Sequence, residues 1–112
     1  MKNGIVAIIG FCLFAAGAAQ AGNPEAGKEK SRTCAACHGP EGNSATGDFP
    51  RLAGQHYDYL VKAMSDYKAG KRKNAIMAPQ AANLSQRDME DLAAYFSHQQ
   101  GLVTRKNSYF VH

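Results

Sequence analysis

An all-α fold of three to five helices is predicted by two apolar stripes with helical spacing and by the lack of any clear strand pattern. In residues 56–70, apolar side chains recur at spacings of three and four, as on one face of a helix; they are Tyr57, Leu60, Val61, Met64 and Tyr67. A second stripe, formed by Met89, Leu92, Ala93 and Phe96, follows a capping box at residues 85–88 in which Asp replaces Glu. With 112 residues, the chain is long enough for one small domain.

The remaining elements are predicted from local start and stop signals. Asn23 and Pro24 are typical of a helix start, and this first helix should continue to about residue 38. Residues 39–54 read as a loop, and residues 75–79 as a short apolar loop that leads into one helical turn through residue 82. Gly70 and Gly101 are expected to end the two amphipathic helices.

The stretch Cys34-Ala35-Ala36-Cys37-His38 carries the chemistry. C-x-x-C-H predicts c-type haem attachment, in which both thiols form thioethers with the vinyl groups and the histidine is the proximal iron ligand. A thioredoxin-like pair would need a βαβ setting, and a structural zinc site would need a second pair of ligands. A disulfide across two residues would be strained. The sequence therefore favours one covalently bound haem c.

Two residues of the loop at 39–54 are expected to support the haem. A ligating histidine normally donates its other ring N–H to an acceptor, and the carbonyl of Pro50 is the predicted acceptor for His38. Leu52 is expected to pack on the haem face, although Phe49 and Leu52 could equally be ordinary core residues.

The sixth iron ligand is predicted to be Met77. Met64 and Met89 lie on apolar helix faces, where methionine more often fills a core, whereas Met77 lies in a predicted loop. A distal histidine or an open iron are the alternatives; the available histidines are His56, His98 and His112. A thioether ligand would raise the reduction potential and close the iron to small ligands, so this choice separates electron transfer from ligand binding.

Residues 1–21 read as a secretory signal peptide, with Lys2, an apolar run and an Ala19-Gln20-Ala21 cleavage signal. This predicts a periplasmic protein whose mature chain has no transmembrane span, with a haem domain at 22–101 and a tail at 102–112. The formal net charge of +4 comes without a basic-aromatic stripe, so nucleic acid is not an expected partner. The short basic run at residues 71–74 is either a solvated turn or a contact for haem propionates or an acidic redox partner.

The chain resembles class I c-type cytochromes, in particular one half of the two-haem periplasmic cytochromes c or their single-haem relatives. The matching features are Gly27 ahead of CAACHG, residues 42–44, FPRLAGQ at 49–55, residues 59–60 and 68–70, Met77, residues 84–85 with Asp88, and LAAYF at 92–96.

The resemblance implies a small cytochrome c fold wrapped around one haem, with Gly27 on the first helix meeting Tyr95 on the last. It implies Cys34 and Cys37 as anchors, His38 and Met77 as axial ligands and Pro50 as the acceptor for His38. It also implies a one-electron carrier rather than an enzyme, monomeric or weakly dimeric. Its partners would be a cytochrome complex, a terminal oxidase or reductase, or a dehydrogenase. The alternatives are a haem subunit of a periplasmic oxidoreductase and a ligand-binding or peroxidatic protein.

Overall fold

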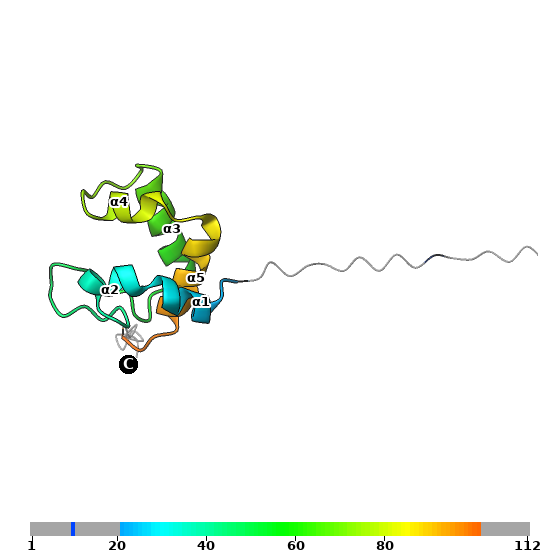
Figure 1. Ribbon diagram of the computed structural model, residues 1–112, viewed down its shortest axis with the longest axis horizontal. Coiled ribbons are helices and arrows are strands. Elements are labelled where there is room, and N and C mark those ends of the chain that lie inside the picture. Colours follow the sequence, from blue (N-terminus) through cyan, green and yellow to red (C-terminus); the bar gives the residue numbers. More distant parts are fainter. Residues whose placement is uncertain (1–9, 11–20, 102–112) are drawn as a thin grey trace, which may run out of the picture.

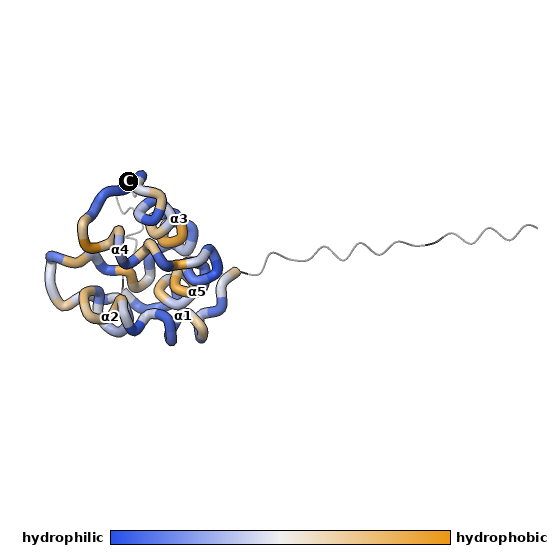
Figure 2. Tube along the Cα trace, turned by 45° about the horizontal axis from the view of Figure 1, so that its top comes forward, coloured by the Kyte–Doolittle hydropathy of each residue, from blue (hydrophilic) through white to orange (hydrophobic). Residues whose placement is uncertain are grey.

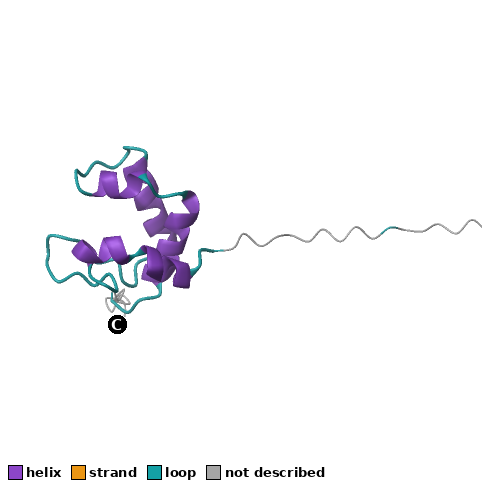
Figure 3. Cartoon of the chain, viewed as in Figure 1, coloured by secondary structure: helices purple, strands orange, loops and turns teal. Residues whose placement is uncertain are grey.

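The computed structural model describes residue 10 and residues 21–101, which form five helices. The predictions for residues 1–21 and 102–112 fall almost wholly outside this part of the chain. The helices are α1 (Pro24–Lys30), α2 (Arg32–His38), α3 (Tyr57–Lys68), α4 (Met77–Ala82) and α5 (Gln86–Ser97). Figure 3 shows helices and loops but no strand among the described residues, so the predicted all-α class is confirmed.

The helix starts follow the predicted capping chemistry. The side chain of Asn23 accepts from the N–H groups of Glu25 and Ala26, and Pro24 is the first residue of α1. At α5, the Ser85 hydroxyl accepts from the Asp88 N–H at 3.0 Å, and the Asp88 carboxylate accepts from the Ser85 N–H at 2.9 Å. The capping box with Asp in place of Glu is therefore confirmed.

Three predicted boundaries are wrong. The single helix expected from Pro24 into the motif is divided at Ser31, whose hydroxyl donates to the Lys28 carbonyl at 2.8 Å. Met77 is the first residue of α4 rather than a loop residue. α5 ends at Ser97, where the preceding carbonyl of Phe96 accepts from the distant N–H of Gly54 at 2.9 Å.

Gly101 therefore does not terminate α5 directly. A Cβ at this position would lie 2.5 Å from the Cβ of Ala53, so the glycine permits close packing of the chain on the loop that carries Ala53.

The core is built around α5. Seven of its residues are buried, among them Leu92, Tyr95 and Phe96, and α1 and α3 pack on either side of it. Figure 2 shows that the chain between α3 and α4 is strongly hydrophilic. Much of the buried set is small (Ala53, Ala81, Ala93 and Ala94), so this core is modest for a stable domain.

The contact between α1 and α5 is backbone against backbone. A Cβ on Gly27 would lie 1.9 Å from the Asp91 carbonyl oxygen and 2.8 Å from the Tyr95 Cβ. The implied meeting of Gly27 with Tyr95 is confirmed, and only glycine allows so close an approach.

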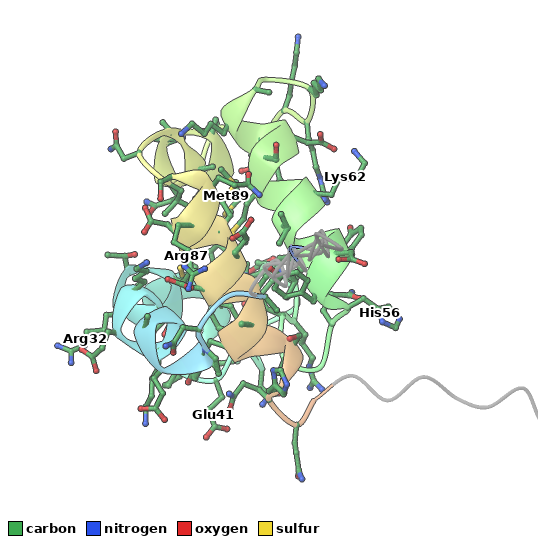
Figure 4. All side chains as sticks on the ribbon, turned by 90° about the vertical axis from the view of Figure 1, so that its right-hand side faces the viewer. Arg32, Glu41, His56, Lys62, Arg87 and Met89 are labelled. Atoms are coloured by element: carbon green, nitrogen blue, oxygen red, sulfur yellow. The ribbon has the colours of Figure 1, made fainter. Side chains whose placement is uncertain are left out.

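A buried carboxylate ties the same two helices together. The Asp91 side chain, 3% exposed, accepts from Lys30 Nζ at 2.7 Å and from the Asn23 N–H at 2.7 Å, and Arg87 Nε lies 3.2 Å from it. Figure 4 shows Arg87 on α5 close to α1. Burial opposes ionisation of Asp91 most strongly, yet Lys30 and the Asn23 N–H together hold the pKa of this carboxyl below its usual value.

α2 and α4 lie on the same side of α5 and face each other (Figure 1). The α3–α4 contact fixes α4, and α1 carries α2, so the fold brings residue 38 and residue 77 to one region. No helix in the described part of the chain has the length and apolar character needed to cross a membrane.

Candidate haem site

The C-x-x-C-H residues occupy α2, which ends at His38. Cys34 and Cys37 are free thiols and are partly buried, so the disulfide alternative is not realised. Burial raises the pKa of the Cys34 thiol. Both sulfur-bearing residues line one cavity of about 200 Å³. The α2 helix thus presents both thiols to the same space.

His38 is buried at the wall of this cavity and has a fixed orientation. Its Nδ1 lies 2.8 Å from the carbonyl oxygen of Pro50. Because a carbonyl can only accept, Nδ1 carries the proton, and the lone pair on Nε2 remains for a metal. Phe49 packs edge-on against the imidazole, with ring centroids 6.3 Å apart. The sequence offers Phe49 only as a possible core residue and does not indicate its contact with His38.

The loop that carries Pro50 is closed on itself and bonded to α5. Within the loop, the Gly42 carbonyl accepts from the N–H groups of Leu52 and Ala53, at 2.7 and 3.0 Å. The Tyr95 hydroxyl of α5 donates to the Pro40 carbonyl at 3.0 Å. These bonds give Pro50 its place beside His38.

Met77 faces the same space from α4. It lines the 200 Å³ cavity and a second one of about 140 Å³, and His38, Pro50 and Tyr67 also line both. Leu52 lines the second cavity only. The structure therefore brings together all six sequence-predicted site residues around these two adjoining cavities.

Among the described residues, the other methionines and histidines that the sequence offered as iron ligands lie away from both cavities. Met89 is 3% exposed within the core, and Met64 packs against the core cluster. His56 is exposed and points away from the fold (Figure 4), and His98 lies with Nδ1 2.7 Å from the Ala94 carbonyl at the end of α5. His112 is outside the described residues. Neither cavity is lined by these residues.

Asn74 is a site residue that sequence reasoning missed. Its side-chain oxygen accepts from the N–H groups of Ile76 and Met77, both at 2.9 Å, and it also lines the larger cavity. Asn74 thereby fixes the start of α4 and the backbone from which Met77 extends. An Asn two or three residues before a short helix is the signal that could have identified it.

These residues fit a covalently attached haem. Two free thiols border an apolar space, an oriented imidazole has a free lone pair, and a thioether faces the same space. Among the described residues there is no group of three or more His, Cys, Asp or Glu side chains that could hold a bare metal ion. The donor set therefore suits a porphyrin iron and does not suit zinc.

A small all-α domain with C-x-x-C-H on its second helix identifies the protein as a class I c-type cytochrome. The chain belongs to the cytochrome c family, whose sequence model matches residues 24–100.

Relatives of known name agree with this family. The chain is 47% identical over 85 residues to cytochrome c4 of Thiocapsa roseopersicina, a match that covers 75% of this chain and 44% of that protein. It is 42% identical over 83 residues to cytochrome c-554(548) of Halomonas halodenitrificans, covering 71% of this chain and the whole of that protein. It is 38% identical over 94 residues to a thiosulfate dehydrogenase electron acceptor of Thiomonas intermedia, a match that covers 82% of this chain and 41% of that protein.

A solved structure gives the same result for the fold. Reduced recombinant cytochrome c4 from Pseudomonas stutzeri superimposes with a TM-score of 0.70 at 47% identity, over 74% of this chain and 48% of that one. The small cytochrome c fold is therefore confirmed. The chain spans less than half the length of the cytochrome c4 relatives it matches.

Proposed function

We propose that this protein is a periplasmic one-electron carrier with one covalent haem c, ligated by His38 and Met77. The observation that carries the proposal is that His38 and Met77 line the same two cavities from α2 and α4. When bound, the haem supplies an iron that alternates between Fe(III) and Fe(II). The protein itself performs no substrate turnover.

Each site residue has a definite task in this proposal. Cys34 and Cys37 hold the haem edge through thioethers, so the cofactor stays bound in both redox states. Pro50 accepts from His38 Nδ1, which orients the imidazole and raises its basicity. Met77 would supply the second protein ligand of the iron, and Leu52 would contribute apolar surface that keeps water away.

Electrons would pass through the exposed edge near the thioethers. Ile76 lines the cavity that contains both cysteines and is 53% exposed, whereas the other large aliphatic side chains among the described residues are buried or half-buried. An apolar contact next to the haem edge suits brief docking of a redox partner, such as a cytochrome complex, an oxidase or a dehydrogenase. The carrier is expected to be a monomer or weak dimer.

Carbon monoxide binding tests whether Met77 blocks small ligands from the iron. The reduced holoprotein at neutral pH should leave its Soret band unchanged under carbon monoxide, because Met77 occupies the sixth position. A Met77→Ala variant provides the positive control, since its iron should bind the gas. Rapid, tight binding by the wild type would instead identify a ligand-binding or peroxidatic protein.

A second function is favoured by one relative. Because the chain is 38% identical to a protein named as a thiosulfate dehydrogenase electron acceptor, it could serve as the haem subunit of a periplasmic oxidoreductase. Affinity purification from its native host separates the two functions. Stoichiometric co-purification with a catalytic subunit supports the subunit role, and recovery of the haem protein alone supports the free carrier.

Export is part of the proposal. Residues 1–21 would direct secretion and be removed after Ala21. N-terminal sequencing of the haem-containing protein from the periplasmic fraction should begin at Gly22. A retained N-terminal segment would show that the protein is anchored instead.

A further inference from the structure

Met77 lies on a segment that has a single helical neighbour. Residues 69–83 leave the end of α3, form α4 and return toward the start of α5. Among the described helices, α4 packs against α3 alone, and Ala81 is its buried residue. Figure 1 shows α4 beside α3 at the edge of the fold. The position of Met77 therefore depends on how this segment is fastened to α3.

The first half of the segment is fastened by bonds close to the end of α3. The backbone N–H groups of Lys71 and Arg72 both donate to the Asp66 carbonyl, at 2.9 and 3.1 Å. The side chain of Asn74 then holds the backbone at the start of α4. These bonds leave the return of the segment toward α5 to other contacts.

The return of the segment is fastened by one side chain. Lys68 is the last residue of α3, and its Nζ donates to the carbonyl oxygen of Leu84, in the linker between α4 and α5. The Leu84 N–H donates in turn to the Ala81 carbonyl at 3.1 Å, and the Leu84 side chain packs against the core cluster. The bond between Lys68 and Leu84 thus joins the two ends of the segment that carries Met77.

The properties of a lysine suit this position. An ammonium group offers three donors and no acceptor, so it can bind a carbonyl while it remains in contact with water. A cation in the last turn of a helix also interacts favourably with the helix dipole. The nearby Asp66 carboxylate is paired with Lys62 at 2.5 Å. Lys68 lines neither cavity, so its role is separate from contact with the haem.

We propose that Lys68 is a positioning residue for Met77: its bond to the Leu84 carbonyl closes the segment 69–83 and slows the release of Met77 from the iron. The proposal rests on Met77 as the sixth ligand, as set out under the proposed function. When this bond is broken, the end of the segment moves more freely relative to α3, and α4 moves with it. Local opening of this kind exposes the sixth position without unfolding α1, α3 and α5.

Imidazole binding to the oxidised holoprotein measures this opening. Imidazole can enter only after Met77 has left, so at high imidazole concentration the binding rate reaches a plateau equal to the rate of Met77 release. Lys68→Met removes the donor and keeps an unbranched side chain, and it should raise the plateau rate about fivefold. Lys68→Arg keeps a cationic donor and should stay within about twofold of the wild type.

Lys71→Met is the matched control. It removes the same charge from an exposed position directly after α3 and leaves the bond between Lys68 and Leu84 in place. Its plateau rate should also stay within about twofold of the wild type, because an exposed charge is screened. Equal acceleration in Lys68→Met and Lys71→Met would overturn the proposal.

Urea denaturation followed by helical circular dichroism separates positioning from general stability. A lower urea midpoint in Lys68→Met with an unchanged plateau rate would overturn the proposal. If Lys68→Met does not yield holoprotein, Lys68→Ala replaces it and should raise the plateau rate in the same way; a wild-type rate there would be equally decisive against the proposal. A wild type whose binding rate rises linearly with imidazole, without a plateau, would contradict Met77 ligation and this proposal together.

Discussion

Gly27 on α1 approaches the backbone of Asp91 on α5 so closely that a Cβ would lie 1.9 Å from the Asp91 carbonyl oxygen. The two helices therefore meet without any side chain between them at this point. α2, with both cysteines and His38, follows directly after α1. The positions of Cys34, Cys37 and His38 therefore depend on this crossing.

Gly27→Ala should destabilise the holoprotein by about 2 kcal/mol or more, because the helices must separate to admit the methyl group. This loss exceeds the gain of about 1 kcal/mol in helix propensity. Urea denaturation followed by haem absorbance gives the free energy of unfolding. Gly47→Ala is the matched control, since nothing lies within 4 Å of a Cβ there. Equal stability of the two variants would show that the helices have room at Gly27.

Stability should fall at acid pH because the carboxylates of Asp88 and Asp91, which pair with Lys30, become protonated. Lys30, above all, together with the capping contacts of Ser85, lowers the pKa of Asp88 to about 2, and the pKa of Asp91 is also lowered. An acid with a depressed folded-state pKa stabilises the fold fully above its unfolded value, about 3.9, and loses that contribution as pH falls through the folded value. We expect the free energy of unfolding to decrease between about pH 4 and pH 2.

Asp91→Asn should reduce the slope of this acid decrease and lower stability at pH 7 by about 1–3 kcal/mol. Urea denaturation at a series of pH values measures both effects. Glu41→Gln, an exposed carboxylate that points to solvent (Figure 4), should match the wild type. A wild-type slope in Asp91→Asn would mean that other groups govern acid unfolding.

Asn74→Ala should loosen the start of α4 and therefore the bond between Met77 and the iron. Asn74 lies two residues before the N-cap Ile76, and loss of the two hydrogen bonds that its side chain accepts should cost about 1 kcal/mol. The far-red thioether–iron charge-transfer band of the oxidised protein should disappear at a lower urea concentration than in the wild type. Asn83→Ala, at the exposed end of the same helix, serves as the control. Identical midpoints for both variants would exclude a role for Asn74 in holding Met77.

The haem-free chain should be largely unfolded. The buried hydrophobic set is small, includes four alanines and leaves two cavities beside His38, so the chain lacks apolar contacts that haem would provide. A Cys34→Ala/Cys37→Ala double variant, isolated without haem, should show weak helical circular dichroism and no cooperative thermal transition. A sharp transition in this variant would show that the polypeptide is stable by itself.

Local signals were sufficient to predict the elements whose determinants are close in sequence. The capping box at Ser85 and Asp88 and the stripe of α3 depend on residues within four positions of one another. The interaction of Gly27 with Tyr95 was implied by the resemblance to the family and not by local signals.

Other features depend on partners far away in sequence and could not be predicted. The buried Asp91 is paired with Lys30 and with the Asn23 N–H, 61 and 68 residues away, and the carbonyl of Phe96 near the end of α5 accepts from the N–H of Gly54. The sequence left the basic run at residues 71–74 open between a solvated turn and a binding contact, and it gave no sign that Arg72 contacts Tyr59 and Tyr67. Such contacts require the tertiary fold.

The far-red absorbance of the oxidised holoprotein tests the central claim, that His38 and Met77 together ligate the haem iron. Ligation by Met77 should give a thioether–ferric iron charge-transfer band in the wild type and in Met64→Ala, and the band should be lost in Met77→Ala. A wild type without the band, or a band that survives in Met77→Ala, would contradict it.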